Sequence, residues 1–231
     1  MLRGHKRTFT GQKTAEIAHD QHQVALVTQG AMVVVNILGA WTVPAGCAAW
    51  IPARTRYAID PLPRAVVHTL YLSSGKLPCS VLTISPLMRA IVDHVCASPS
   101  LSSKSARAIE TLVRDQLPDQ RELPLFVPAL TSSLPTRVVD ALLADPADTP
   151  RMRDLAAELE VSVRTLERTF LADAGMTLGE WRQRARICRA IALLAEGMAV
   201  KDVALEVGYE TASAFVAAFK GYVGTTPRHV R

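Results

Sequence analysis

The sequence predicts a multi-domain α+β protein, in which a small antiparallel β-barrel of jelly-roll type precedes an all-α domain. Short β-branched runs between Gly and Pro turns fill the chain from Val24 to Leu72, and this spacing is typical of a barrel or sandwich. From Asp154 onward, apolar residues recur at helical spacing in two similar helix pairs joined by one long helix. A chain of 231 residues is long enough for two domains with separate cores.

The composition restricts the class of protein. Hydrophobic residues make up 49% of the chain, and no apolar run is long enough to span a bilayer. The polar N-terminus lacks the pattern of a signal peptide, so we expect a cytoplasmic protein. The cysteines show no metal-ligand spacing and are expected to be reduced and mostly buried: Cys47, Cys79, Cys96 and Cys188.

The net charge of +5 suggests a polyanionic partner, but the distribution of charge weakens that argument. Counting Lys and Arg against Asp and Glu, residues 1–82 carry +5, residues 83–149 carry −2 and residues 150–231 carry +2. The helical domain is therefore only mildly basic. Binding to a polyanion must depend on where its arginines point.

The segment Asp154–Phe170 has the pattern of a helix-turn-helix unit. Three apolar residues at i, i+3 and i+7 form its inward face: Val163, Leu166 and Phe170. Arg164 and Arg168, four residues apart, then share the outward face. Ser162 is a suitable N-cap for the second helix, and the small Ala156 suits a helix crossing. In such a unit the second helix enters the DNA major groove and presents its exposed side chains to the bases.

A second copy of the frame occupies Lys201–Phe219, with one extra residue in its second turn. The positions Ala204, Gly208, Phe215 and Phe219 match Ala156, Glu160, Leu166 and Phe170. Between the copies, Thr177–Glu196 reads as one helix that begins with a capping box. Its outward side carries a basic stripe that would suit phosphates, although a solvated helix face has the same pattern: Arg182, Arg186 and Arg189.

Together with GYETASAFVAAFKGYVGTTP near the C-terminus, these features resemble the AraC/XylS family of transcription regulators. The resemblance covers about Pro135–Arg231, and its most specific residues are Gly208, Tyr209, Ser213, Ala214, Phe215, Phe219, Gly224 and Pro227. It implies a DNA-binding regulator. Glu160 departs from the family, which usually has glycine at this turn because the backbone tends toward positive φ. The glutamate either strains the turn by about 1 kcal/mol or signals a different turn.

Residues 1–82 resemble the cupin-type sensor domain found ahead of some AraC-family DNA-binding domains. The resemblance lies between Gly30 and Pro52 and includes Trp41, Pro44, Gly46, Trp50, Ile51 and Pro52. Cupin enzymes hold a metal with a His-x-His pair, an acidic residue and a later histidine. Here the pair reads Ile17-Ala18-His19, and Tyr57 replaces the later histidine. We therefore expect neither a metal nor another cofactor.

A cupin-like barrel implies a small-molecule effector at its mouth, where other small barrels bind ligands. Five polar or aromatic side chains are candidates to line this effector pocket: His19, Gln23, Trp50, Tyr57 and His68. Each of them could equally serve only to pack and close the barrel.

Residues 83–134 are predicted to be a helical dimerisation segment and linker. Helices are expected over Pro86–Ala97 and Ser103–Leu117. Their apolar faces would be Leu87, Ile91 and Val95 in the first, and Ile109, Leu112, Val113 and Leu117 in the second. In the AraC family such helices often mediate dimerisation, which implies a homodimer. The proline-rich Pro118–Pro135 then reads as the interdomain linker, and Arg137–Leu143 would open the DNA-binding domain, residues 135–231.

The two units are expected to contact DNA differently. Arginine can offer a bidentate fork to guanine, and glutamate can accept from cytosine N4. Base contacts are expected from Arg164, Thr165, Glu167, Arg168 and Ser213. The outward face of the second unit has few groups for base hydrogen bonds, so it should mainly grip the backbone. Phosphate contacts are expected from Arg182, Arg186, Lys201, Lys220 and Arg228.

Three functions compete at this point. The first is a transcription regulator that senses a small-molecule effector and binds double-stranded promoter DNA as a homodimer, with RNA polymerase left open as a further partner. The second is a cupin-type metal-dependent enzyme with an accessory helical domain, against which Ile17 and Tyr57 count. The third is a DNA-binding protein without an effector. No serine, cysteine or paired-carboxylate arrangement argues for catalysis, so we predict that the protein is not an enzyme.

Overall fold

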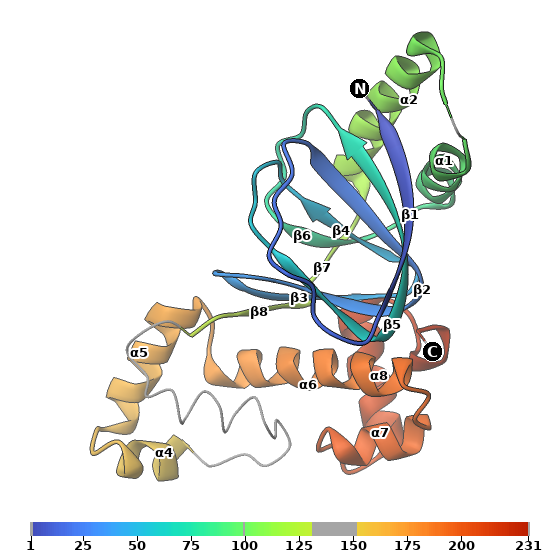
Figure 1. Cartoon of the computed structure of the whole chain (residues 1–231). Coiled ribbons are helices and arrows are strands. Elements are labelled where there is room, and N and C mark those ends of the chain that lie inside the picture. Colours follow the sequence, from blue (N-terminus) through green and yellow to red (C-terminus); the bar gives the residue numbers. More distant parts are fainter. Residues whose placement is uncertain (1, 99, 131–151, 231) are drawn as a thin grey trace.

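The computed structural model describes residues 2–98, 100–130 and 152–230. A curled antiparallel sheet stands on a layer of helices (Figure 1). The strands are β1 (Arg3–Thr10), β2 (His22–Asn36), β3 (Gly39–Pro44), β4 (Cys47–Ile51), β5 (Ala58–Leu72), β6 (Ser80–Thr83), β7 (Glu122–Leu123) and β8 (Phe126–Pro128). The helices are α1 (Pro86–Ala97), α2 (Ser103–Gln116), α4 (Met152–Glu158), α5 (Val163–Ala174), α6 (Leu178–Ala195), α7 (Val200–Glu206) and α8 (Ala212–Val223), with 3₁₀ turns η1 (Leu117–Asp119) and η2 (Pro227–His229).

Two 15-residue strands, β2 and β5, form the centre of the sheet and pair with each other along most of their length. The strand order is β1-β5-β2-β4-β6-β7, and β3 pairs with both β2 and β8. The pairing of β2 with β5 is irregular at Val27/Gln29 and at Gly30/Ala31. Gly30 is required there, since its φ is 74° and a Cβ would lie 1.9 Å from the carbonyl oxygen of Arg64. Such irregularities increase the local bend, which helps the sheet to curl.

Four strands lie outside the β-rich region that the sequence indicated. β1 carries four basic residues in RGHKRTFT and lies at a sheet edge, where charged side chains prevent edge-to-edge association. β6 is only four residues long. β7 and β8 occupy part of the predicted linker Pro118–Pro135, so the linker prediction was wrong for residues 122–128. They pair with β6 and β3 over long sequence separations, which composition does not reveal.

The two faces of the sheet carry separate hydrophobic clusters. The inner cluster includes Val27, Ile51 and Val67, whereas the outer cluster lies under α1 and α2 and includes Leu26 and Leu70. Both predicted helices are present, but the predicted face of α1 was partly wrong. Its buried residues are Met88, Val92 and Val95, while Leu87 is 47% exposed. Both stripes are apolar, so periodicity alone could not choose between them.

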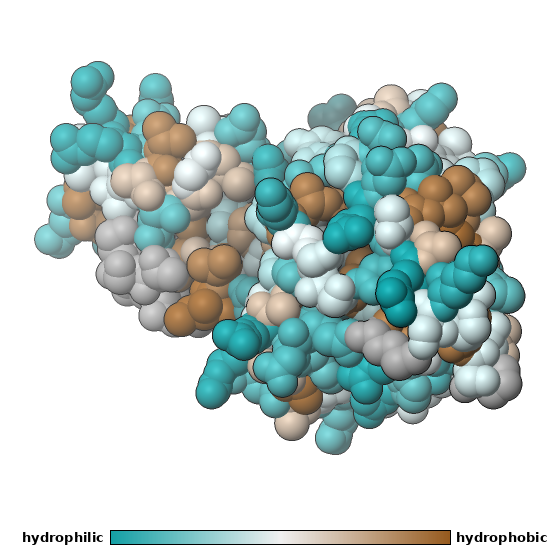
Figure 2. Space-filling model, turned by 90° about the horizontal axis from the view of Figure 1, so that it is seen from above, coloured by the Kyte–Doolittle hydropathy of each residue, from teal (hydrophilic) through white to brown (hydrophobic). Residues whose placement is uncertain are grey.

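The C-terminal helices continue the barrel core without a break, since one cluster joins inner barrel residues to residues of α6, α7 and α8. α6 lies beneath the barrel, with α4 and α5 at one end and α7 and α8 at the other (Figure 1). Seen from above, a smaller lobe at the α4–α5 end projects from the larger body that contains the barrel (Figure 2). Among the described helices, none is both long and apolar enough to cross a membrane. The predicted helix Arg137–Leu143 lies outside the described residues.

Candidate DNA-binding surface and effector site

The first helix pair forms as the sequence predicted. Ser162 caps α5, because its hydroxyl accepts a 3.1 Å hydrogen bond from the backbone N–H of Thr165. The small Ala156 is buried where α4 meets α5. Phe170 packs edge-on against Trp181 of α6, with ring centroids 6.0 Å apart. These contacts fix the rotation of α5, and with it the direction of its outward side chains.

The outward face of α5 borders an open groove of about 540 Å³. The groove is lined by Arg164, Glu167, Arg168, Leu171, Thr177, Leu178 and Gly179. Arg164, Glu167 and Arg168 are exposed and form no ion pair within 4.0 Å in the described part of the chain. The charged side chains on this face therefore do not neutralise one another through salt bridges. Thr165 is half-buried, and its hydroxyl lies 2.8 Å from that of Ser162, which makes it less available.

The turn of the first unit adopts the backbone that the family resemblance implied. Glu160 has a φ of 55°, in the left-handed region that non-glycine residues rarely adopt. In the second unit the matching Gly208 has a φ of 79°. The glutamate therefore occupies a strained turn of the ordinary type rather than a different turn.

The second helix pair also has the predicted faces. Phe215 packs between Tyr209 and Phe219, at 5.5 Å from each ring centroid. Ser213 and Lys220 are exposed on the other side of α8. This side borders a groove of about 840 Å³, whose lining includes Val200, Lys201, Ser213, Ala217, Lys220, Thr226, Arg228 and His229. Lys201, Lys220, Arg228 and Ser213 are thus brought to one surface.

The basic stripe of α6 is less available than the sequence suggested. Arg182 and Arg186 are both half-buried, and both have contacts within the chain. Burial, followed by the charge of Arg186, lowers the pKa of Arg182. Arg189 is exposed. The structure therefore places the two predicted phosphate contacts on α6 in more enclosed surroundings than the exposed Lys201, Lys220 and Arg228.

The structure brings only three of the five predicted effector residues together. The Tyr57 hydroxyl donates a 2.9 Å hydrogen bond to Oε1 of Gln23, and the His19 ring lies 6.3 Å from that of Tyr57. Burial raises the pKa of Tyr57 to about 12, so the phenol keeps its proton as a donor. Gln23 is 3% exposed on the inner side of the sheet. Its Nε2 has no hydrogen-bond partner in the described residues.

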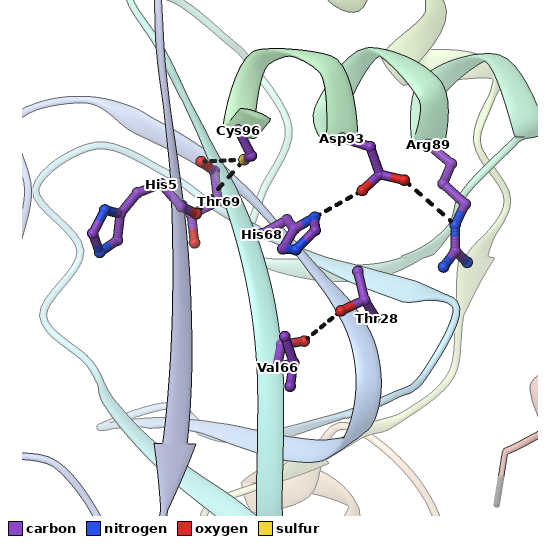
Figure 3. A network of polar contacts seen from close by, with 8 residues as sticks. All are labelled: His5, Thr28, Val66, His68, Thr69, Arg89, Asp93 and Cys96. Carbon is purple, nitrogen blue, oxygen red and sulfur yellow. Dashed lines mark hydrogen bonds and ion pairs between the residues drawn. The ribbon is translucent and has the colours of Figure 1, made fainter. Parts of the chain in front are cut away.

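Trp50 and His68 do not line the inside of the barrel, so that part of the prediction was wrong. Trp50 belongs to the outer cluster, stacks on His22 at 5.3 Å and donates a 2.8 Å hydrogen bond to the carbonyl of Leu77. His68 points toward α1, where its Nδ1 lies 2.7 Å from Asp93 (Figure 3). Side chains alternate between the two faces of a strand, and the sequence did not indicate which face of β4 or of β5 points outward.

The positions that align with cupin metal ligands do not form a metal site. Ile17, which pairs with Tyr57 by a β-bridge, has no ligand atom in its side chain. The groups that remain are the imidazole of His19, the protonated phenol of Tyr57 and the amide of Gln23. These groups offer no carboxylate and do not fit a divalent ion. Over the residues that the structure describes, no three His, Cys, Asp or Glu side chains gather as a possible metal site.

All four cysteines are free thiols. Cys47 is buried, and the other three are partly buried. Desolvation raises the pKa of Cys47 and Cys79 to about 12 and that of Cys188 to about 11. Thiols of this kind are poor nucleophiles near neutral pH.

The residues of β1 that face the barrel interior were missed because β1 was not recognised as a strand. The Arg3 guanidinium lies 4.4 Å from the centre of the Tyr71 ring, and His19 lies 5.5 Å from the same ring. Arg7 lies over Phe9 at 4.6 Å. The alternation Arg3, His5, Arg7, Phe9 is a signal that could have identified this strand, but it does not indicate which face of the strand points inward.

One face of α6 holds the sensor and DNA-binding halves together. Three of its side chains, at i, i+3 and i+7, donate hydrogen bonds to the carbonyls of β8 and of the residue before it. The pairs are Trp181 Nε1 to Pro128 at 3.3 Å, an Arg184 N–H to Phe126 at 3.5 Å and Cys188 Sγ to Leu125 at 3.8 Å. On its other side β8 pairs with β3 of the barrel. The strand β8 is therefore shared between the two halves.

Comparison with known proteins agrees with this geometry. The model of an AraC-like ligand binding domain matches residues 1–134, and that of a helix-turn-helix domain matches residues 155–231. The HTH-type transcriptional regulator NimR of Escherichia coli K12 is 26% identical over 215 residues, which cover 90% of this chain and 79% of NimR. The regulator RipA of Corynebacterium glutamicum is 38% identical over 90 residues, 39% of this chain and 27% of RipA.

Among solved structures, ToxT from Vibrio cholerae aligns over 99% of this chain and 97% of its own, at 13% identity and a TM-score of 0.40. The ligand binding model alone covers more than half of the chain, and the helix-turn-helix model covers most of the remainder. The chain belongs to the AraC family of DNA-binding transcription regulators, with an AraC-like ligand binding domain ahead of its helix-turn-helix domain.

Proposed function

We propose that the protein reads promoter DNA through α5, and that α8 mainly holds the DNA backbone. The observation that carries this proposal is the outward pair Arg164 and Arg168, which is exposed, lacks acidic partners among the described residues and borders the α5 groove. Each guanidinium can fork onto guanine N7 and O6, and Glu167 can accept from cytosine N4. A good bidentate contact contributes about 1–3 kcal/mol of discrimination.

The second unit contributes mainly affinity. Its outward surface gathers Lys201, Lys220 and Arg228, which can contact phosphates, whereas Ser213 is its main polar group for a base. Thr165 in the first unit takes a secondary role at the bases. The half-buried Arg182 and Arg186 take secondary roles at the phosphates. The two surfaces lie at opposite ends of α6 (Figure 1). Its 18 residues make it about 27 Å long, near the spacing of about 34 Å between successive turns of the major groove.

The barrel is the proposed effector domain, with His19, Gln23 and Tyr57 at the effector site. The shared strand β8 provides a direct physical connection from the barrel to α6, so a ligand that moves β3 and β8 would move the helix that spaces the two units. The protein acts as a regulator in the cytoplasm, where promoter DNA and RNA polymerase are available. We assign no catalytic step to it.

A homodimer through α1 and α2 completes the proposal. Both helices use one face to cover the outer cluster of the barrel, and on their other side Leu87 is 47% and Leu112 is 39% exposed. Apolar side chains at this level of exposure suit contact with a second copy across a two-fold axis. Sedimentation of the native protein and of a Leu112→Glu variant tests this arrangement, because the charge should shift the population toward monomer.

Selection of bound sequences from a random duplex library tests the DNA-binding proposal. The native chain should enrich a defined motif, and Arg164→Ala and Arg168→Ala should each relax the preference at particular base pairs. Arg64→Ala provides the control, because this exposed arginine lies on β5, outside both grooves and outside the proposed dimer helices. A motif that stays unchanged in both α5 variants would contradict base reading by α5.

A further inference from the structure

The strand β1 presents basic side chains to the inside of the barrel. In the register of β1 with β5, Arg3 lies opposite Tyr71 and Arg7 lies opposite Val67, which belongs to the inner cluster. Directly opposite residues share a face of the sheet. His5 lies between the two arginines, and its ring points away from α1, which covers the outer face (Figure 3). All three basic side chains are exposed, so solvent and small solutes reach this side of the edge strand.

The two inner arginines lack a counter-charge. In the described ranges, neither Arg3 nor Arg7 has a carboxylate within 4.0 Å. The acids of the neighbouring loop pair elsewhere, Asp20 with Arg54 and Glu16 with Arg56, each at 3.8 Å. Aromatic rings hold both guanidinium groups, at 4.4 Å over Tyr71 and 4.6 Å over Phe9. Guanidinium groups positioned in this way suit a planar, bidentate anion.

A buried amide lies in the same inner row. Gln23 is opposite Tyr71 on β2, so the row runs from Arg3 through Tyr71 to Gln23. The carbonyl oxygen of the Gln23 side chain already accepts from Tyr57, and its Nε2 is a buried donor with no partner in the described residues. Guanidinium and amide N–H groups both require an acceptor atom. The half-buried His19 ring stands at the edge of the row, 5.5 Å from Tyr71.

From this arrangement we infer that the effector is a small organic carboxylate, held by Arg3 and Arg7 on β1 and by the amide of Gln23 in the row of Arg3. This inference rests on the effector control proposed above and specifies the chemical class of the effector. A cationic ligand would meet two uncompensated positive charges. A neutral ligand could use Gln23 and Tyr57 but would leave both arginines without a counter-ion.

Thermal unfolding of the full chain with a panel of carboxylates tests the inference. The panel contains acetate, pyruvate, succinate, benzoate, phenylacetate and octanoate, each beside its uncharged primary amide, with potassium phosphate as an inorganic anion. At least one carboxylate should raise the melting temperature while its amide and phosphate do not. Calorimetric titration of that carboxylate should then show an affinity at least about ten-fold lower in the Arg3→Gln/Arg7→Gln variant, a factor that corresponds to about 1.4 kcal/mol.

Lys6→Gln is the matched control. Lys6 carries the same charge on the same strand. Because side chains alternate along a strand, Lys6 lies on the face opposite to that of Arg3 and Arg7. Its replacement should change the affinity less than about two-fold. Gln23→Glu should weaken binding as the arginine variant does, because it replaces the amide donor by a second anion.

Four results would overturn the inference: no carboxylate stabilises more than its amide, phosphate stabilises equally, Lys6→Gln weakens binding as much as the double variant, or the double variant lowers DNA affinity without any carboxylate. The last result would assign β1 to DNA. Duplex selection with the same proteins separates this inference from the proposed function. If duplex selection yields a defined motif while no carboxylate of the panel stabilises the protein, the proposed DNA-binding function stands and only the carboxylate inference fails.

Discussion

The indole Nε1 of Trp181 donates a 3.3 Å hydrogen bond to the carbonyl of Pro128, and this contact joins the long helix of the DNA-binding half to the last strand of the barrel. Trp181 is 1% exposed and also packs against Phe170 of α5. One side chain therefore contacts both the sensor domain and the first recognition helix. A change in the barrel that displaces β8 would act directly on the residue that supports α5.

Trp181→Phe should destabilise the junction between the two halves. The variant keeps an aromatic ring but leaves the Pro128 carbonyl without its donor, and an unpaired buried acceptor costs about 1–3 kcal/mol. Urea unfolding should show this loss, and hydrogen exchange should accelerate in β8. Trp50→Phe is the comparison, because it removes a tryptophan hydrogen bond on the outer face of the barrel and should not increase exchange in β8. Equal exchange in the two variants would contradict a role for Trp181 at the junction.

Glu160→Gly should stabilise the first helix-turn-helix unit. At a φ of 55° a residue with a Cβ pays about 1 kcal/mol that glycine does not. For a chain of this length, about 1 kcal/mol corresponds to a rise of about 2–4 °C in melting temperature. Glu158→Gly, two residues earlier in α4, should have the opposite effect because glycine destabilises a helix. Gly208→Ala should lower the melting temperature, since it introduces the same strain into the second unit.

Acid should destabilise the protein partly through His19. Burial, and then the positive charge of Arg3, lower the pKa of His19 below its ordinary value of 6.5, against a smaller opposing effect of Asp20. The unfolded chain therefore binds the proton more readily than the folded chain. The contribution to stability is complete above pH 6.5 and is lost as the pH falls through the folded-state pKa. Melting temperatures at pH 7.5 and pH 5 should differ less in His19→Gln than in the native protein.

Lys220→Ala should weaken binding to all DNA sequences alike. Lys220 lies on the exposed side of α8 beside Lys201 and Arg228, a surface suited to phosphates. Loss of one phosphate contact should reduce the slope of log affinity against log salt by about 0.9. Arg164→Ala should instead change the preferred bases. An altered base preference in Lys220→Ala would show that α8 takes part in sequence reading.

The sequence by itself determined the architecture of the C-terminal half. Helices are built from local contacts, so their spacing and caps are readable in the chain: Ser162 caps α5, and Thr177 and Glu180 form the capping box of α6. The inward faces of α5 and α8 followed from the same periodicity. A positive φ at Glu160 was one of the two alternatives that the family resemblance left open, and the structure has that one. No distant part of the chain was needed for these conclusions.

The sequence also predicted an antiparallel barrel in the N-terminal half, but only the tertiary structure decided how its strands pair. Its strands pair over long sequence separations, as β1 does with β5 and β3 with β8, and this pairing turned part of a predicted linker into the junction with α6. It also decided which side of each strand faced inward. Trp50 and His68 were assigned to the interior but lie under the outer helices, whereas Arg3 and Arg7 lie on the inner face. A two-residue period defines two faces, and only packing against the rest of the chain determines which one encloses the ligand site.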